Sequence, residues 1–267
     1  MRITLGADPE VFLEYPHGTV KSAIGYVGGT KEEPKVLSRE GFFVQEDNVA
    51  AEFNIPPAST AEEFVESIQW AIKAIDLEVD RYGFKTRISA SEFFPEFELT
   101  APQAMIFGCE PDYNAWTLNM NPRPHSSEPS LRSCGGHIHV AVDVPVSIPQ
   151  MVQSMDLFVG VPSVMMDADV KRRELYGQAG AHRTTQYDVT SWEYRVPSNF
   201  WIRTPQLTRW AYEQTVRAVR WAARYSNNEW SAFLKGHDLG HKIQKCINNS
   251  DVGLSHQLIQ NYSLVVV

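Results

Sequence analysis

The sequence has no excess of positive charge and no long hydrophobic run. Its 267 residues include 24 lysines and arginines against 32 aspartates and glutamates, which gives a net charge of −8. A dedicated nucleic-acid binder usually presents a basic face, so this balance argues against that class. No apolar run reaches the roughly 20 residues that cross a bilayer, and the first residues lack the basic and apolar regions of a secretory signal. We therefore expect a cytoplasmic protein without a nucleic-acid or membrane partner.

Cysteine is also scarce. The three cysteines, Cys109, Cys134 and Cys246, lie far apart and form no C-x-x-C pair, so neither a zinc knuckle nor a disulfide framework is indicated. Internal repeats and low-complexity linkers are missing as well. With 43% hydrophobic and 21% charged residues, a chain of this length can bury a large core. We predict one domain over residues 1–267, with a core over about 1–204 and a helical part over 205–267.

What the sequence does contain is a strand-like stretch with two histidines, residues 133–142. In a strand, side chains two residues apart share a face, so His137 and His139 point the same way. Ile138, Val140 and Val142 take the opposite face and resemble a core. Paired imidazoles suit metal ligation or phosphate contact. The alternative is an ordinary half-buried strand whose polar face carries two histidines and no ligand.

The same alternation recurs in three further segments that place acidic, amide or arginine side chains on one face. These are residues 3–13 with Asp8 and Glu10, residues 46–55 with Asn48, Glu52 and Asn54, and residues 191–196 with Glu193 and Arg195. An ordinary solvent-exposed sheet usually carries Thr, Ser, Lys and Gln outward. Four strands with charged faces therefore indicate a sheet that is built around a site.

Helical spacing appears on either side of these strands. A capping pattern at Ser59 or Thr60 starts a periodic apolar run that Gly83 ends. Residues 148–159 and 205–225 are predicted as two further helices, with shorter pieces over 229–234 and 242–248. Residues 41–54 are expected to form one or two strands that end at Pro56 and Pro57. The apolar tail 264–267 is read as an edge strand or a partner contact.

A short basic stretch, residues 171–183, stands out in this acidic chain. It contains Arg172, Arg173 and Arg183 together with Gly177 and Gly180. Arginines beside flexible glycines suit phosphate or carboxylate binding, because the guanidinium group offers paired donors. The alternative is a charged, solvated loop.

In order along the chain, these motifs resemble the glutamine synthetase and glutamate–cysteine ligase superfamily. More specifically, they resemble the type-2 carboxylate–amine ligases (amidoligases) of phages and bacteria. The segments that carry the resemblance are Gly6–Glu10, Asp47–Pro57, Gly135–His139, Arg172–Gly177 and Glu193–Ser198. Each motif is short and unspecific by itself, and it is their order that carries the resemblance. The helical part after residue 205 contributes little.

The resemblance implies an α+β fold, with a curved antiparallel sheet, a half-barrel or funnel like the glutamine synthetase catalytic domain, backed by α-helices. It implies a single catalytic domain that binds ATP and Mg²⁺ or Mn²⁺ in the concave face. ATP would phosphorylate a carboxylate, and an amine would then attack the acyl phosphate. The partners would be a small-molecule or peptide carboxylate and an amine, in a bacterial or phage-infected cytoplasm. A homo-oligomer stays open, since a ring of subunits does not follow from the fold.

The resemblance also suggests roles for individual residues. Carboxylates and an imidazole would hold the metals, because Mg²⁺ and Mn²⁺ prefer hard oxygen ligands. The candidate metal ligands are Asp8, Glu10, Glu52, His137 and Glu193. The candidate ATP or phosphate contacts are Arg172, Arg173, Tyr176, Arg195 and His139. The candidate catalytic residues are Glu52, Arg195 and Arg183.

Two departures and two competing functions accompany this interpretation. Asp8 stands where better-known relatives have a longer glutamate, and the chain is shorter than most glutamine synthetases, so glutamine or glutathione synthesis is not expected. One competing function is a zinc hydrolase that uses His137, His139 and a carboxylate, since imidazoles favour zinc. The other is a catalytically silent binding protein of the same fold. An arginine-rich loop and a Glu-x-Arg pair are rare in zinc hydrolase sites and suit polyphosphate better. A silent binding protein is disfavoured because the candidate site residues are all intact: Asp8, Glu10, Glu52, His137, Glu193 and Arg195.

Overall fold

The alternating segments pair in one large antiparallel sheet. The computed structural model describes residues 1–105, 112–122, 128–185 and 190–267, and within them the sheet has eleven strands that do not close into a barrel. The strands are β1 (Ile3–Ala7), β2 (Glu10–Glu14), β3 (Val20–Lys21), β4 (Lys35–Val36), β5 (Phe43–Asp47), β6 (Ala50–Ala58), β7 (Lys85–Arg87), β9 (Tyr113–Asn114), β11 (Ile138–Val142), β12 (Ala181–Thr184) and β13 (Thr190–Tyr194). A separate pair is formed by β8 (Ser91–Phe93) and β10 (Leu131–Ser133).

The strand order places the motif-bearing strands side by side. The main path runs β3-β2-β6-β1-β11-β13-β12-β9, with β5 paired to β6, β4 to β5, and β7 to β2. His139 lies opposite Glu193, and Glu193 lies opposite Arg183 on the next strand. On the other side of β1, Glu10 lies opposite Glu52. Residues distant in sequence therefore form rows across the sheet, because directly opposed side chains share a face.

The first predicted strand is in fact two. It breaks between β1 and β2 at Asp8 and Pro9, and β6 pairs with both pieces. Proline has no N–H to give to the ladder, while its carbonyl accepts from the Phe53 amide at 3.1 Å. The prediction that β6 ends at Pro56 and Pro57 is wrong. The strand continues to Ala58, and its pairing with β1 shifts register there, as at a bulge, where proline is tolerated.

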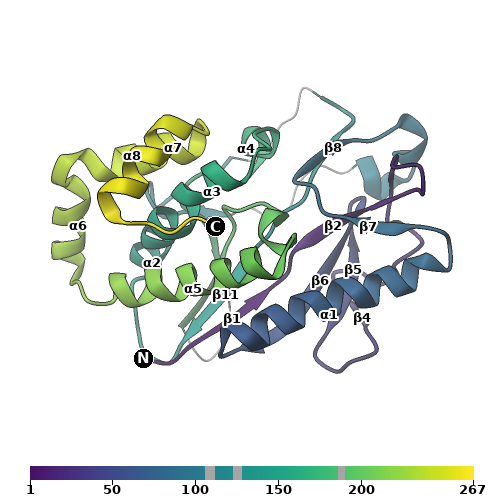
Figure 1. Ribbon diagram of the computed structural model, residues 1–267, viewed down its shortest axis with the longest axis horizontal. Helices are drawn as coiled ribbons and strands as arrows, with labels where there is room; N and C mark the ends of the chain where they lie inside the picture. Colours follow the sequence, from purple (N-terminus) through teal and green to yellow (C-terminus); the bar gives the residue numbers. More distant parts are fainter. Residues whose placement is uncertain (106–111, 123–127, 186–189) are drawn as a thin grey trace.

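Two long helices cover one face of the sheet. In Figure 1, α1 (Ala61–Asp80) and α5 (Pro205–Ala222) lie across the strands, and they also contact each other. The predicted cap is present, since the Thr60 side chain accepts from the Glu63 amide at 3.2 Å. Buried side chains such as Phe64 and Ile68 lie on the inner side of α1. The helices thus close the back of the sheet and leave its charged face toward the cavities described below.

The remaining helices gather at one end of the molecule (Figure 1). They are α2 (Ile148–Met155), α3 (Val161–Met166), α4 (Lys171–Leu175), α6 (Asn227–Lys235), α7 (Leu239–Asn248) and α8 (Val252–Tyr262), with a π-turn over Asp156–Gly160 that joins α2 to α3. Short 3-10 turns are η1 (Glu96–Glu98), η2 (Pro102–Met105), η4 (Asn199–Ile202) and η5 (Gly236–Asp238). The helix α8 was not predicted. The tail 264–267 forms no strand, so the prediction of an edge strand there is wrong. The alternative, a contact with a partner, stays a prediction.

One hydrophobic core runs from Ile3 to Leu264 and includes the inner faces of the C-terminal helices. The predicted division at residue 204 stays a prediction. Cys134 and Cys246 are buried free thiols, and Cys109 lies outside the described residues. Among the helices that the structure describes, none is long and apolar enough to cross a membrane. The α+β class with an antiparallel sheet backed by helices is confirmed.

Candidate functional site

Two glycines before β11 allow three chain segments to meet at the site. A Cβ on Gly136 would clash with the Ser198 carbonyl, and the Trp201 indole donates to the Gly136 carbonyl at 3.0 Å. Gly135 donates its amide to the Glu10 carboxylate at 2.6 Å and accepts from the Glu10 amide at 3.0 Å. The backbone can approach this closely only because glycine lacks a side chain. The glycines therefore bring the histidine strand against both Glu10 and the segment after β13.

The first group of functional side chains is the histidine cluster, defined here as Asp8, His137, His139 and Glu193. The distance from His139 Nε2 to Asp8 Oδ1 is 3.0 Å, and that from His137 Nδ1 to the same oxygen is 3.5 Å. His137 Nδ1 also lies 3.2 Å from Glu193 Oε1. The two imidazoles thus face the same side, as the alternation predicted. All but the half-buried His139 are buried.

Opposite charges balance one another in the histidine cluster. Burial by itself would raise the pKa of the Asp8 carboxyl, but His139 and His137 outweigh it and hold that pKa well below its usual value. Burial likewise opposes protonation of His139, yet the Asp8 charge prevails and raises the pKa of His139 to about 9. Arg195 donates to the Glu193 carboxylate, and Arg183 Nη1 lies 3.8 Å from it. Each of the two carboxylates therefore has cationic neighbours.

The second group is the carboxylate cluster, defined here as Glu10, Asp47 and Glu52. One oxygen of each lies within 4.8 Å of the others. Burial, followed by the charges of Asp8 and Glu10, raises the pKa of Glu52 well above its usual value, and burial also raises that of Glu10. Within the part of the chain that the structure describes, no salt bridge joins these three carboxylates to a cation. Gln45 donates to Glu52 at 2.7 Å.

Asp47 was not among the predicted ligands, although the sequence contained a signal for it. It is the first residue of the Asp47–Pro57 segment that carries the family resemblance, and it lies at the end of β5 beside the turn to β6. Alternation along a single strand would place the side chain of Asn48, rather than that of Asp47, on the same face as Glu52. The turn breaks that alternation, so the side chain that joins Glu10 and Glu52 is the aspartate.

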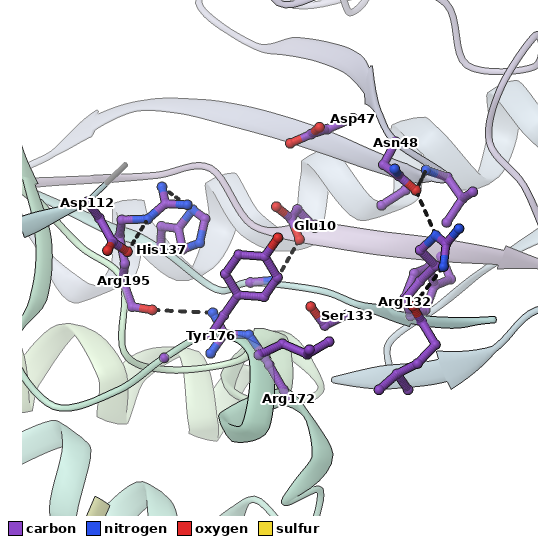
Figure 2. A pocket seen from close by; sticks show the side chains of 17 residues that line it. Glu10, Asp47, Asn48, Asp112, Arg132, Ser133, His137, Arg172, Tyr176 and Arg195 are labelled. Carbon is purple, nitrogen blue, oxygen red and sulfur yellow. Dashed lines mark hydrogen bonds and ion pairs between the residues drawn. The ribbon is translucent and has the colours of Figure 1, made fainter. Parts of the chain in front are cut away.

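Two cavities meet at these clusters. The larger, of about 1200 Å³, lies over β1, β6, β11 and β13, and the smaller, of about 90 Å³, lies beside the β5–β6 turn and α4. Both are lined by Glu10, Asp47, His137 and Arg195. Figure 2 shows the smaller cavity, with Glu10 and Asp47 on one side and Tyr176 and Arg172 on another. The four shared residues, Glu10, Asp47, His137 and Arg195, therefore border both cavities.

Arg195 stands at the junction of the two cavities. It is buried, donates to Glu193, and has Nη1 at 3.4 Å from His137 Nδ1. Its Nε lies 3.5 Å from Asp112 Oδ2 (Figure 2). Asp112 was not among the predicted site residues, because the segment around it shows no strand alternation or helical period. Only the folded chain brings it to an arginine 83 positions later.

The other predicted phosphate contacts lie in different places. Arg183 lines the larger cavity, and Arg172 and Tyr176 line the smaller one. Arg172 donates to the carbonyls of Val196 at 2.9 Å and Arg195 at 3.3 Å, so it also supports the strand end that carries Arg195. Arg173 lines neither of these cavities. Its guanidinium donates to hydroxyls of Ser163 and Ser250.

The donor set fits divalent cations. Asp8, His139 and Glu193 each offer one atom within 4.8 Å of the others, and the carboxylate cluster offers oxygen atoms alone. Asp8 Oδ1 and His139 Nε2 are buried and make no hydrogen bond of normal geometry, although they lie 3.0 Å apart. Such atoms are available to a metal ion, and carboxylate with imidazole is a ligand set that Mg²⁺, Mn²⁺ and Zn²⁺ accept to different degrees. His139 joins His137 as a candidate ligand.

A known family model matches part of the chain. Residues 126–233 match the family described as phage phiEco32-like COOH.NH2 ligase-type 2. The matched segment contains the histidine strand, the arginines of α4 and β12, and the strand of Glu193 and Arg195. The match confirms, over this segment, the resemblance seen in the motifs. No curated protein matches the chain.

Similar solved structures are only distantly related. GmaS without ligand is 10% identical with a TM-score of 0.46, and the alignment covers 100% of this chain and 70% of that one. A GmaS/ADP complex is 9% identical with a TM-score of 0.43, covering 100% and 71%. A glutamine synthetase from Plasmodium falciparum is 9% identical with a TM-score of 0.42, covering 82% and 52%. At these scores the likeness carries no argument about chemistry.

Proposed function

We propose that this chain, which matches the type-2 COOH.NH2 ligases over residues 126–233, is an ATP-dependent carboxylate–amine ligase. The observation that supports this most is the meeting of two cavities at two groups of candidate metal ligands, with Arg195 between them. Phosphoryl transfer depends on positioning and charge neutralisation rather than on covalent chemistry by the protein. At this junction, Arg195 and the candidate metal ligands can position a phosphoryl group and neutralise its charge.

Two divalent cations would have separate places in this scheme. One would be held by Asp8, Glu193 and the imidazoles, and the other by Glu10, Asp47 and Glu52. When bound, Mg²⁺ or Mn²⁺ would neutralise phosphate charge and polarise the reacting oxygens. The fit rests on the buried atoms of Asp8 and His139, which lie 3.0 Å apart without a hydrogen bond of normal geometry, and on the mutual repulsion in the carboxylate cluster.

The sizes of the two cavities suggest that each binds a different part of the reactants. The cavity of about 1200 Å³ can hold a nucleotide, and Arg183 on its wall can contact the phosphates. The cavity of about 90 Å³ admits only a compact group, such as the end of the carboxylate substrate or the amine. Arg195 lines both cavities, so it can stabilise the phosphoryl group as that group passes from one to the other.

The proposed reaction has two steps. A carboxylate oxygen attacks the γ-phosphorus and ADP leaves. The amine nitrogen then attacks the acyl carbon, phosphate leaves, and the nitrogen loses a proton. Glu52 is a candidate for both of its predicted roles, because a buried carboxylate on the wall of the larger cavity can bind a cation or accept that proton.

A zinc hydrolase is the second candidate function. It is favoured by one observation, the convergence of two imidazoles on Asp8 at 3.0 and 3.5 Å. A zinc site alone gives no reason for Arg195 and Arg183 to line the same cavity as the histidines. The ligase proposal accounts for both arginines through phosphate.

The experiment that tests the ligase proposal is calorimetric titration of metal-stripped protein with ATP, with and without Mg²⁺ or Mn²⁺. We expect binding that requires the divalent ion, followed by ADP release when amino acids and peptides are screened as substrates. Arg195→Gln should abolish that release, while Arg209→Gln, the same change at a surface site on α5, should not. Absence of nucleotide binding with every metal would overturn the proposal. Binding that never yields ADP would favour a silent binding protein.

A further inference from the structure

The three acids of the carboxylate cluster are not held in the same way. Glu10 accepts a hydrogen bond from the Gly135 amide at 2.6 Å, and Glu52 accepts one from Gln45 at 2.7 Å. The exposed Asp47 carboxylate accepts no hydrogen bond from any residue that the structure describes. Its position therefore depends on the backbone of the β5–β6 turn.

That turn is fixed mainly by Asn48. Its φ of +53° lies in the left-handed region, which asparagine tolerates better than most residues. Asn48 Oδ1 accepts from the Val49 amide at 2.9 Å, and Asn48 Nδ2 donates to the Gln103 carbonyl at 3.2 Å. Gln103 in turn donates to the carbonyls of Glu46 at 3.2 Å and Asn48 at 3.4 Å. The turn is thus tied to η2.

Arg132 completes this connection from the other side. It lies on β10, its side chain is almost fully buried, and its Nε donates to Asn48 Oδ1 at 3.1 Å. Nη2 donates to the Ala104 carbonyl at 2.7 Å, and Nη1 donates to the carbonyls of Pro129 and Leu131. Figure 2 shows Arg132 beside Asn48, across the cavity from Arg195.

Burying a guanidinium group is costly, and burial lowers the pKa of Arg132. The guanidinium group donates to three backbone carbonyls and to the side chain of Asn48. These hydrogen bonds hold the backbone of the β5–β6 turn in place. Outer partners that hold a ligand in place typically change metal affinity by about 10- to 100-fold when they are removed. The backbone that these hydrogen bonds orient leads directly to Asp47.

We infer that Asn48 and Arg132 are positioning residues that hold Asp47 against Glu10 and Glu52, and that they set the affinity of this one cation site. The inference rests on the proposed function, since it assumes a divalent cation at the carboxylate cluster. It does not involve the histidine cluster, whose side chains come from other strands. The two sites should therefore respond differently to a change at the turn.

The test is a Mn²⁺ titration of metal-stripped protein, with free Mn²⁺ measured by electron paramagnetic resonance. Asn48→Gly is the first variant, because glycine adopts a φ of +53° without strain but removes every side-chain bond of Asn48. We expect two bound Mn²⁺ in the parent and, in the variant, about 10- to 100-fold weaker binding at one site with the other unchanged. Asn119→Gly, at an exposed asparagine that lines neither cavity, is the matched control and should bind as the parent does.

Arg132→Lys is the second variant. It keeps the positive charge but loses the planar guanidinium fork that donates to Asn48, Ala104, Pro129 and Leu131 at once, so the same site should weaken. A variant that binds both ions as tightly as the parent, or that weakens both sites equally, overturns the positioning role and leaves the ligase proposal standing. A parent that binds no Mn²⁺ overturns both. Weakening in Asn48→Gly and Arg132→Lys alike, restricted to one site, supports the inference.

Discussion

The histidine cluster and the carboxylate cluster lie on the same sheet but balance their charge in different ways. In the first, Asp8 and Glu193 have imidazole and guanidinium neighbours, and the pKa of Asp8 is lowered. In the second, three carboxylates have no ion-pair partner among the described residues, and the pKa of Glu52 is raised. One group is already neutralised by the protein, whereas the other requires a proton or a cation.

This difference predicts different metal preferences. A set that includes imidazole accepts Mn²⁺ or Zn²⁺ readily, whereas a set of carboxylate oxygens favours Mg²⁺. Metal-free protein should be destabilised mainly at the carboxylate cluster, where three like charges lie close together and the carboxyl of Glu52 is buried. The predictions below separate the two clusters on these grounds.

The largest expected effect is on catalysis. Glu193→Ala removes a candidate metal ligand and the acceptor of Arg195. Loss of a metal held at the phosphate costs several kcal/mol, so ATP turnover should fall by about a thousandfold. ADP release measures this directly. Glu213→Ala, at an exposed glutamate of α5, is the control, and a Glu193→Ala enzyme as active as that control would contradict the assignment.

The next prediction is that neutralising one acid in each cluster changes stability in opposite directions. In metal-free protein, Glu193→Gln breaks a buried ion pair and should lower the unfolding free energy by about 3 kcal/mol. Glu52→Gln removes a buried like charge while its amide oxygen can still accept from Gln45, so stability should rise by about 1 kcal/mol. Thermal unfolding would show shifts of roughly 2–4 °C per kcal/mol.

Saturating Mg²⁺ provides the control for that pair. The ion would use the Glu52 carboxylate, so the gain from Glu52→Gln should vanish or reverse once Mg²⁺ is present. Binding of a ligand to the folded state adds about 2.7 kcal/mol to the free energy of unfolding when the ligand concentration is a hundred times Kd. If Glu52→Gln and Glu193→Gln shift the unfolding temperature in the same direction without metal, the contrast between the clusters is wrong.

A smaller effect is expected on metal choice. His139→Asn replaces a nitrogen ligand by an amide and leaves the carboxylate cluster unchanged. Mn²⁺ affinity at one site should fall by about tenfold, while Mg²⁺ affinity at the other stays the same. Competition titrations with the two ions measure the ratio. His256→Asn, at an exposed histidine of α8, should leave both affinities as they are.

The smallest effect concerns Asp156, a carboxyl group behind the sheet. Burial raises its pKa without the charge of any neighbouring carboxylate among the described residues. Asp156 is fully buried and accepts from Trp116 Nε1 at 2.6 Å and Tyr194 Oη at 2.9 Å, and burial raises its pKa to about 7. The folded state therefore retains a proton that the unfolded chain has lost, so stability falls as pH rises from about 4 through 7. Between pH 6 and 8 this contributes about 1 kcal/mol.

Asp156→Asn should remove that pH dependence, although it also loses one acceptor. The relevant quantity is the slope of unfolding free energy against pH, measured in urea for the parent and the variant. Other titrating groups contribute equally to both chains, so the difference isolates Asp156. Identical slopes would show that burial alone does not raise the pKa here, and that the clusters need another explanation.

The sequence predicted those features that depend on strand alternation. His137 and His139 share a face because they are two residues apart, and that geometry survives folding. The α+β fold class was implied by the family resemblance, and the same alternation together with helical periodicity is consistent with it. The break at Asp8 and Pro9 was missed, since alternation continues across it and only the pairing of β6 with both halves reveals it.

The missed features depend on where side chains go after the backbone turns. Asp112 reaches Arg195 through a contact between segments that share no local pattern. The arginines of α4 looked alike in sequence, yet one supports a strand end near the smaller cavity and the other contacts two serines. A cation next to glycines indicates anion binding only when its donors are not taken by the backbone.

The two clusters also differ in when the chain can build them. The acids of the carboxylate cluster all come from residues 10–52, and their strands pair with each other early in synthesis. The histidine cluster needs Glu193, so it cannot form until most of the chain has left the ribosome. Until β11 arrives, one edge of β1 has no partner in the sheet, and an open strand edge invites aggregation. The nascent chain therefore carries this open edge from the synthesis of β1 until the synthesis of β11.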